Sequence, residues 1–329
     1  MKRRLLASLL TLVMMLNLLP TVAWARNDEG IDADSVEMYS SDDVVTSGPI
    51  TIWTDKIVKI TVPAGDAVSS SNTDIVSVEK NGTAVTLTGG SKEGRAEVTA
   101  GESTWVVYNY ASEAEYNYLY SLFHEKRISV MGDSISTIKD KIPSLLSWLS
   151  WRRTLRRYDN TTGKEMTFER NYWGDVITRF SAAEGIDEAW SGSTIGSKAA
   201  SMASKDRINK LDDNGTPDVI LYYGGSNPDS SVGTFDPDAD YAKTVDWAKS
   251  YSDTASAYAA SLQRMKETYP DAEIIAMIPY YEQNNIPKQA EVIEQIAKHY
   301  DITTIDLREL RNQEGISPNN ALHPNMDGH

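Results

Sequence analysis

Five short apolar segments alternate with longer amphipathic stretches from residue 127 onward, and no other feature narrows the possible folds as much. Apolar runs of this length are typical of strands buried on both faces, and the stretches between them have helical periodicity. This alternation predicts an α/β fold with a parallel sheet covered by helices on both faces. The predicted strands are Ile128–Met131, Ile186–Trp190, Val219–Tyr223, Glu273–Ile278 and Thr303–Leu307, and the predicted helices are Tyr172–Ala183, Lys198–Leu211, Asp240–Tyr269 and Lys288–Tyr300.

Small and polar residues follow the ends of several of these strands. The carboxyl ends of parallel strands lie at one edge of the sheet, where open α/β folds bind their ligands. We therefore expect four segments that are distant in sequence to converge on one crevice. They are Gly132–Ser134, Trp190–Ser193, Gly224–Asn227 and Asn320–Asn325.

The residue types in these segments are those of a serine hydrolase. Ser134 is the candidate nucleophile, at the N-terminus of the next expected helix, and His323 is the candidate base. Gly192 and Asn227 are candidate donors to an oxyanion. Glycine admits close approach of its N–H, and an asparagine side chain supplies a second donor.

Taken together, the four segments resemble the sequence blocks of the SGNH hydrolases, the GDSL-type esterase superfamily. The resemblance covers about residues 127–329. It implies a flavodoxin-like three-layer α/β/α sandwich and hydrolysis of an ester through an acyl-enzyme. It further implies Ser134 as nucleophile, His323 as base, and an oxyanion hole made by the Ser134 N–H, the Gly192 N–H and the Asn227 amide. No metal and no cofactor is implied.

Three features depart from the pattern of that family. Asn320 stands where the family has an aspartate; it can accept the imidazole N–H but cannot stabilise imidazolium by charge. Pro228 replaces the aspartate that usually follows the third-block asparagine, so we expect an altered loop around Asn227. The sequence stops at His329, where the family continues into a final helix, which predicts a fragment.

Two interpretations stay open: an active enzyme, or a non-catalytic surface or glycan-binding protein on a decayed hydrolase scaffold.

Residues 143–158 interleave leucine and tryptophan with arginine directly after the nucleophile segment. This stretch fits a lid or acyl-binding wall, a helix at a membrane surface, or an ordinary helix packed on the domain. Aromatic residues here and at two strand ends form the candidate substrate wall. They are Trp148, Trp151, Trp190 and Tyr281.

The first 25 residues have the pattern of a secretory signal peptide. Basic residues at 2–4 precede an apolar run from Leu5 to Leu19, and a small-x-small site ends at Ala25. The apolar run is too short for a membrane span. We therefore expect cleavage after Ala25 and a secreted or cell-surface protein without a transmembrane segment in its mature chain. Residues 26–48 are acidic and aperiodic, which predicts a flexible leader.

Residues 49–110 carry short alternating segments separated by turn signals, and this pattern predicts a small all-β sandwich. The run from Ser69 to Val78 resembles the bacterial Ig-like domains of secreted proteins, which implies a spacer or adhesion module. Trp53 and Trp105 are either strand core residues or carbohydrate-binding side chains. Residues 111–126 are expected to form a helical connector to the domain at 127–329.

The chain carries a net charge of −15, which would repel nucleic acid and anionic membranes. It has no cysteine, which excludes disulfides, thiol nucleophiles and thiolate metal sites.

The sequence therefore predicts a secreted serine esterase whose partner is an ester substrate, namely O-acyl or acetyl groups on a carbohydrate. A lipid or acyl-ester hydrolase with a lid at 143–158 is the enzymatic alternative. The Ig-like domain would supply contact with the cell surface.

Overall fold

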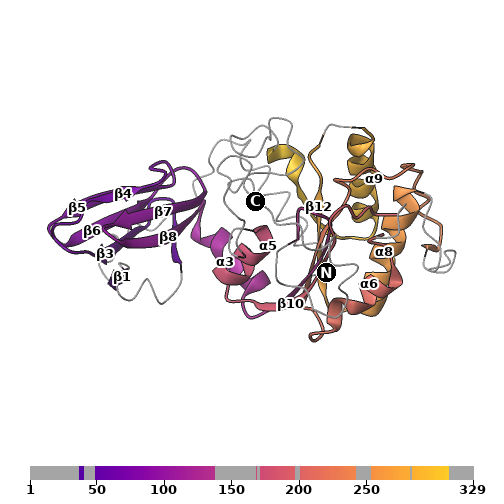
Figure 1. Ribbon diagram of the computed structural model, residues 1–329, viewed down its shortest axis with the longest axis horizontal. Coiled ribbons are helices and arrows are strands. Elements are labelled where there is room, and N and C mark those ends of the chain that lie inside the picture. Colours follow the sequence, from indigo (N-terminus) through magenta and orange to yellow (C-terminus); the bar gives the residue numbers. More distant parts are fainter. Residues whose placement is uncertain are drawn as a thin grey trace, which may run out of the picture. The chain divides into compact units, whose positions relative to one another are not determined.

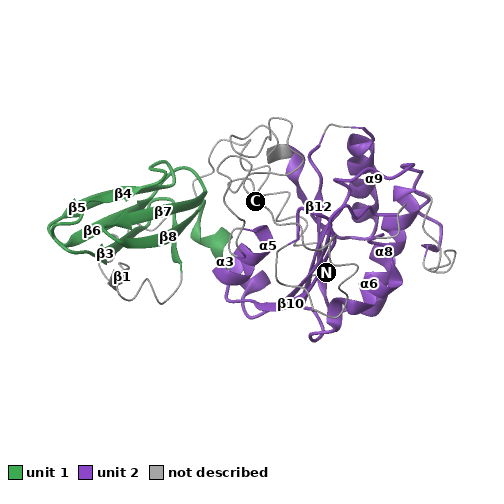
Figure 2. Ribbon diagram, in the orientation of Figure 1, with its two compact units in different colours: residues 1–118 green, residues 119–329 purple. Residues whose placement is uncertain are grey.

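The computed structural model describes residues 49–137, 168, 171–196, 201–241, 253–281 and 284–310, together with the backbone of a strand at 37–40. The chain divides into two compact units, residues 1–118 and 119–329, which Figure 2 shows in different colours. The predicted signal peptide and the stretch 143–158 lie outside the described residues. Among the described residues, no helix has the length and apolar character needed to cross a membrane.

The first unit consists of two four-stranded sheets that share one apolar core (Figure 1). Their strand orders are β1-β3-β6-β5 and β2-β8-β7-β4. Inward and outward residues alternate, as in β3, where Val58 and Ile60 are buried and Ile57 is exposed. An all-β region is thus confirmed, and its Ig-like identity stays a prediction. The strands are β1 (Glu37–Ser40), β2 (Ile50–Trp53), β3 (Ile57–Thr61), β4 (Val68–Ser70), β5 (Val76–Asn81), β6 (Ala84–Gly89), β7 (Gly94–Ala100) and β8 (Ser103–Tyr110).

One detail of this unit differs from the expectations, and a second decides between two alternatives that the sequence left open. Part of the predicted leader forms β1, which pairs in parallel with β3 and so satisfies the outer edge of that strand. Trp105 is completely buried in the core, so the carbohydrate-binding alternative is wrong for that residue. Trp53 is half-buried, and its ring stacks on Tyr116 with 6.4 Å between centroids.

The predicted connector contains α3 (Glu113–Phe123). Ser112 begins this helix: its hydroxyl accepts the N–H of Glu115 at 3.2 Å, and the Glu115 carboxylate accepts the N–H of Ala111 at 2.9 Å. Such reciprocal contacts satisfy donors that a helix start would otherwise leave unpaired. The first turn of α3 is therefore specified by its own sequence.

The second unit is built on a five-stranded sheet of order β10-β9-β11-β12-β13, in which every neighbouring pair is parallel. In chain order this is 2-1-3-4-5, the flavodoxin-like order. All five residues of β11 are buried, as expected for a strand covered on both faces. The strands are β9 (Arg127–Gly132), β10 (Ala183–Ala189), β11 (Val219–Tyr223), β12 (Glu273–Ile278) and β13 (Thr303–Asp306). The predicted parallel α/β sheet is confirmed.

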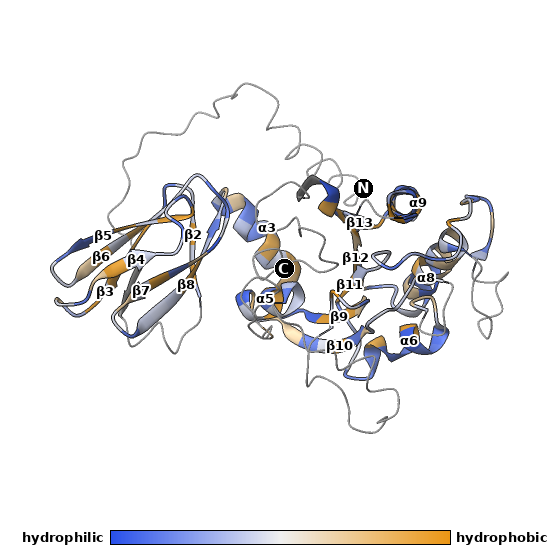
Figure 3. Ribbon diagram, turned by 45° about the horizontal axis from the view of Figure 1, so that its top comes forward, coloured by the Kyte–Doolittle hydropathy of each residue, from blue (hydrophilic) through white to orange (hydrophobic). Residues whose placement is uncertain are grey.

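Helices cover both faces of this sheet. They are α5 (Tyr172–Arg179), α6 (Lys205–Asn209), α8 (Thr254–Thr268) and α9 (Ile286–His299). α5 lies on one side, and α6, α8 and α9 lie on the other (Figures 1 and 3). β11 shows how the two faces alternate. Ile220 and Tyr222 join the core formed with α6, α8 and α9, whereas the Tyr223 ring lies beside Tyr172 of α5.

The helices and three of the strands, β9, β10 and β13, differ in their bounds from the predictions. α5 ends at Arg179, four residues early, because Ala183 already begins β10. α6 spans five residues instead of fourteen, and a short 3₁₀ helix at Lys210–Asp212 follows it. Periodicity alone does not separate a helix from the turns that flank it.

Candidate active site

Ser134 stands two residues beyond the end of β9, in a tight turn. The Asp133 carboxylate accepts the N–H of Ile135 at 2.9 Å, and the Thr137 hydroxyl donates to the carbonyl of Ser134 at 2.8 Å. Ser134 itself is only 6% exposed. The helix expected after it would lie beyond residue 137, outside the described residues. The turn presents Ser134 at the carboxyl edge of the sheet, where α/β folds bind ligands.

The start of α5 supports the same turn. The Asn171 amide donates to the carbonyl of Ile135 at 3.2 Å, and the Trp173 indole donates to the carbonyl of Ser136 at 2.8 Å. The hydroxyls of Tyr172 and Ser136 are 2.8 Å apart. Asn171 also accepts the N–H of Trp173 and so begins the helix. Three consecutive residues of α5 and its cap thus fix the turn that carries Ser134.

The loop after β10 carries Gly192. The N–H of Ser193 donates to the carbonyl of Trp190 at 3.0 Å, which closes a four-residue turn. Gly192 occupies the third position with φ of +74°. This is the position at which a turn of type II needs a positive φ, and glycine adopts it without steric cost.

Three hydrogen bonds join the first three of the four predicted segments to one another; the fourth, at 320–325, lies outside the described residues. The N–H of Trp190 donates to the carbonyl of Gly132 at 3.0 Å, which links the second segment to the first. The Asn227 amide donates to the carbonyl of Ser193 at 2.9 Å, which links the third to the second. The Ser226 hydroxyl donates to the Asp133 carboxylate, which links the third to the first. Convergence of these segments, expected from the sequence, is therefore a property of the structure.

Side chains of α9 and α8 support the loop after β11. Gln289 is completely buried; its amide donates to the carbonyl of Gly225 at 3.1 Å and its oxygen accepts the N–H of Asp229 at 2.7 Å. The buried Asp229 carboxylate accepts the N–H of Gly196 at 3.1 Å and the Thr254 hydroxyl at 3.0 Å. These contacts were not predicted. They flank Pro228, and the predicted effect of that proline stays a prediction.

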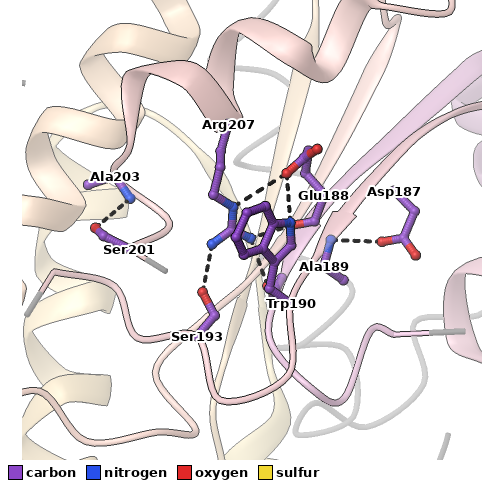
Figure 4. Close-up of polar contacts among 9 residues, drawn as sticks. Asp187, Glu188, Ala189, Trp190, Ser193, Ser201, Ala203 and Arg207 are labelled. Carbon is purple, nitrogen blue, oxygen red and sulfur yellow. Dashed lines mark hydrogen bonds and ion pairs between the residues drawn. The ribbon is translucent and has the colours of Figure 1, made fainter. Parts of the chain in front are cut away.

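A buried arginine on α6 reaches the loop after β10 and the end of β9 (Figure 4). Arg207 is 3% exposed and donates to the Ser193 hydroxyl at 2.6 Å and to the carbonyl of Gly132 at 3.2 Å. Its Nε lies 3.5 Å from the Glu188 carboxylate, which also accepts the Trp190 indole N–H at 2.8 Å. In the sequence, the one sign of this cluster is a glutamate, Glu188, among the last residues of a predicted strand.

Tyrosines gather near the ends of β11 and β12. The rings of Tyr280 and Tyr281 stack with centroids 4.3 Å apart, and those of Tyr172 and Tyr223 lie 6.4 Å apart. Burial raises the pKa of the Tyr223 hydroxyl well above its ordinary value, and the nearby Tyr281 and Asp133 raise it further. Tyr281, a predicted wall residue, follows the end of β12 by three residues, stacks on Tyr280 and is 8% exposed.

The remaining predicted site residues have different outcomes. Trp190 is half-buried, and its ring lies 4.9 Å from the Arg207 guanidinium. The candidate base, the candidate acid-position residue and two wall residues lie outside the described residues. These are His323, Asn320, Trp148 and Trp151.

Comparison with known proteins gives one family match. The model of the GDSL-like lipase/acylhydrolase family matches residues 126–328. A comparison with curated proteins found no match.

Several solved structures are similar to the chain. A candidate GDSL-like lipase from Bacteroides uniformis is 25% identical, with 62% of this chain and 90% of that chain covered and a TM-score of 0.45. A second from Bacteroides ovatus is 22% identical, with 62% and 91% covered and a TM-score of 0.45. A family two carbohydrate esterase from Clostridium thermocellum, in complex with cellohexaose, is 13% identical, with 78% and 83% covered and a TM-score of 0.37. With TM-scores below 0.5, none of these likenesses assigns a substrate or a residue role.

The family match includes the nucleophile, glycine and asparagine segments that the structure joins, and it extends over more than half of the chain. The chain therefore belongs to the GDSL-like lipase/acylhydrolase family, within the SGNH superfamily, and is an ester-hydrolysing enzyme.

Proposed function

We propose that this enzyme is a serine esterase in which Ser134 forms the acyl-enzyme. One observation carries the proposal: the three hydrogen bonds that tie the Ser134 turn, the Gly192 turn and the Asn227 loop to one another. Loops fixed in this way can hold a nucleophile and oxyanion donors in constant geometry. Preorganised donors supply much of the rate enhancement in acyl transfer.

In the proposed mechanism, Ser134 Oγ attacks the ester carbonyl carbon while His323 takes the hydroxyl proton. The N–H groups of Ser134 and Gly192 and the Asn227 amide stabilise the resulting oxyanion. The intermediate collapses, His323 returns the proton to the leaving alcohol, and an acyl-enzyme remains. Water, deprotonated by His323, then attacks the acyl group and releases the carboxylic acid and free Ser134. Asn320 would accept the imidazole N–H and hold its orientation.

The proposed substrate is a carbohydrate that carries O-acyl or acetyl groups. The tyrosines at the ends of β11 and β12 support this choice, because a tyrosine combines a flat apolar ring with a hydroxyl. We further propose that the chain is exported through the signal peptide at 1–25 and that its all-β region is an Ig-like module acting at the cell surface. The leader pattern and the alternating strands of that region support these points.

The proposal is tested by hydrolysis assays on the purified chain. The substrates are p-nitrophenyl acetate, p-nitrophenyl octanoate and an acetylated xylan. The variants are Ser134→Ala and Asn320→Asp, with Ser231→Ala as an exposed control. Loss of the nucleophile is expected to lower kcat by at least about 10⁴-fold, whereas Asn320→Asp is expected to raise it.

Three outcomes would contradict parts of the proposal. Equal activity in Ser134→Ala and the unchanged chain would exclude Ser134 as nucleophile. A preference for octanoate over both acetyl substrates would favour the lipid-ester alternative. A folded chain that is inert in every form would favour the glycan-binding alternative.

A further inference from the structure

The Arg207 guanidinium connects three parts of the candidate site (Figure 4). One of its terminal nitrogens donates to the Ser193 hydroxyl at 2.6 Å. The other donates to the carbonyl of Gly132 at 3.2 Å and to the carbonyl of Glu188. Gly132 is two residues before Ser134, and Ser193 directly follows Gly192. A single side chain thus spans the strand that carries the nucleophile and the turn that carries a proposed oxyanion donor.

The charge of Arg207 is balanced within the same cluster. Arg207 and Glu188 are each about 3% exposed, and the Arg207 Nε lies 3.5 Å from the Glu188 carboxylate. That carboxylate is in turn held by the Trp190 indole N–H at 2.8 Å. A buried charge is stable only when it is paired and hydrogen-bonded, so the guanidinium has little freedom to leave this position.

Arg207 has no part in proton transfer or nucleophilic attack. A guanidinium stays protonated in proteins and has no acceptor, so it cannot serve as a base. Its terminal nitrogens donate to protein oxygens, and its planar fork holds several acceptors in one fixed geometry. Lysine, with a single ammonium on a flexible stem, cannot reproduce that arrangement.

We propose that Arg207 is a positioning residue that fixes the Gly192 turn against the end of β9, and with it the oxyanion hole relative to Ser134. This inference rests on the proposed function. Asn227 and Asp229 hold the same loop through the carbonyl of Ser193 and the N–H of Gly196. Arg207 adds a side-chain link from this loop to the nucleophile strand. Oxyanion donors act only over a narrow range of distances, so a small displacement of the turn would cost turnover.

The test uses the full chain with Arg207→Lys, Ser193→Ala and the double variant. Arg264→Lys is the matched control, since this half-buried arginine of α8 donates to the Asn209 side chain of α6. Four quantities are measured for each form: amide hydrogen exchange in residues 190–196, kcat and KM for p-nitrophenyl acetate, inhibition by an alkyl boronic acid, and Tm. The boronate forms a tetrahedral adduct with an active serine, so its affinity reports on the oxyanion hole.

In Arg207→Lys we expect faster exchange in residues 190–196, a loss of kcat on the order of 10²-fold, and a KM changed less than about threefold. Boronate inhibition should weaken in parallel with kcat. Because Arg207 acts through Ser193, the double variant should lose less than the product of the two single losses. Arg264→Lys should match the unchanged chain in exchange and kinetics, even if its Tm falls.

Unchanged exchange in residues 190–196 would overturn the inference, whatever the activity. A fall in Tm with unchanged kcat and boronate affinity would also overturn it, because it would reduce Arg207 to a stabilising ion pair. Failure of the proposed function is seen separately, as equal activity in Ser134→Ala and the unchanged chain.

Discussion

The Asn227 side chain donates a 2.9 Å hydrogen bond to the main-chain carbonyl of Ser193. This bond joins the loops that follow β10 and β11, which are not adjacent strands, because β9 lies between them. It therefore spans the position at which β9 ends and the Ser134 turn begins. An amide group has two N–H donors, so the same side chain can hold the loop and still donate to an oxyanion.

Replacement of Asn227 is expected to act on turnover. Asn227→Ala removes the proposed donor and should lower kcat by about 10²–10³-fold, with a smaller effect on KM. Asn227→Asp should lose at least as much, because a carboxylate repels the developing oxyanion. Steady-state kinetics with p-nitrophenyl acetate provide the measurement, and a kcat within twofold of the unchanged chain would exclude Asn227 from the oxyanion hole.

A side chain at residue 132 is expected to destabilise the enzyme. A Cβ there would lie 2.4 Å from Oγ and 2.7 Å from Cβ of Ser136, a fully buried residue whose hydroxyl is bonded to Tyr172. Gly132→Ala should therefore lower the free energy of unfolding by about 1–3 kcal/mol in urea titrations. Ser136→Gly removes both clashing atoms, so the double variant should lose less than the sum of the single losses.

A matched control for this steric effect is Gly65→Ala, because a Cβ at residue 65 meets no atom within 4 Å. Its free energy of unfolding should stay within about 0.5 kcal/mol of the unchanged chain. Additive losses in the Gly132 and Ser136 variants would show that the close approach is not what requires glycine at 132.

Tyr223 and Tyr222 should respond oppositely to loss of their hydroxyls. The Tyr223 hydroxyl is buried without a hydrogen-bond partner among the described residues, whereas the Tyr222 hydroxyl is bonded to Ser261 at 3.0 Å. Tyr223→Phe should leave the free energy of unfolding unchanged or raise it by about 1 kcal/mol, and Tyr222→Phe should lower it by about 1 kcal/mol. Urea titrations of both variants measure the contrast. Equal losses in both would contradict it.

The buried Tyr223 hydroxyl should also make the stability of the protein depend on pH. Burial raises the pKa of folded Tyr223 above its ordinary value of 10.0, so the unfolded chain loses this proton first as the pH rises. The group therefore costs stability above pH 10, and Tyr223→Phe should become more stable relative to the unchanged chain there. Thermal unfolding at pH 8 and pH 10.5 tests the sign.

The pairing of Asp306 with Arg308 should make the stability of the protein depend on pH in the acidic range. Arg308 donates to both of its carboxylate oxygens, from Nε at 2.8 Å and from a terminal nitrogen at 2.6 Å, and this pairing lowers the pKa of Asp306. The stabilisation is then fully present above the unfolded pKa of about 4 and is lost as the pH falls toward the folded pKa.

Asp306→Asn should thus lower Tm at pH 7, and this effect should shrink as the pH falls below about 4. The pair is partly exposed, so the loss at pH 7 should not exceed about 1 kcal/mol. Thermal unfolding across this pH range is the measurement, and a difference in Tm that does not depend on pH would contradict the assignment.

Much of the second unit could be predicted from local patterns. The apolar run of Val219–Tyr223 matches β11 residue for residue, and Glu273–Ile278 matches β12. A strand buried on both faces needs apolar residues at consecutive positions, so the length of the apolar run predicts where the strand begins and ends. Helix ends were less predictable. α6 has five residues because the chain must turn at 201–204, and nothing local distinguishes that turn from a helix.

Some residues of the candidate site could likewise be predicted from local patterns, and others could not. Ser134, Gly192 and Asn227 could be identified because each follows an apolar strand and carries a chemically distinctive group. Arg207, Gln289 and Asp229 could not, since each acts on a loop distant in sequence from its own position. Arg207 and Gln289 lie on amphipathic helices and Asp229 lies in a loop. Polar residues in such places are ordinarily solvated, and the sequence does not show that these three are buried.

By itself, the sequence determined the parallel sheet, the edge at which the candidate site lies and the residues proposed for its chemistry. Those properties depend on hydrophobic period and on the ends of strands, which are local. Only the tertiary structure decided how the three loops are tied together and which buried side chains hold them. Those contacts join residues far apart in the chain. They form because a buried polar group costs free energy unless it has a hydrogen-bond partner.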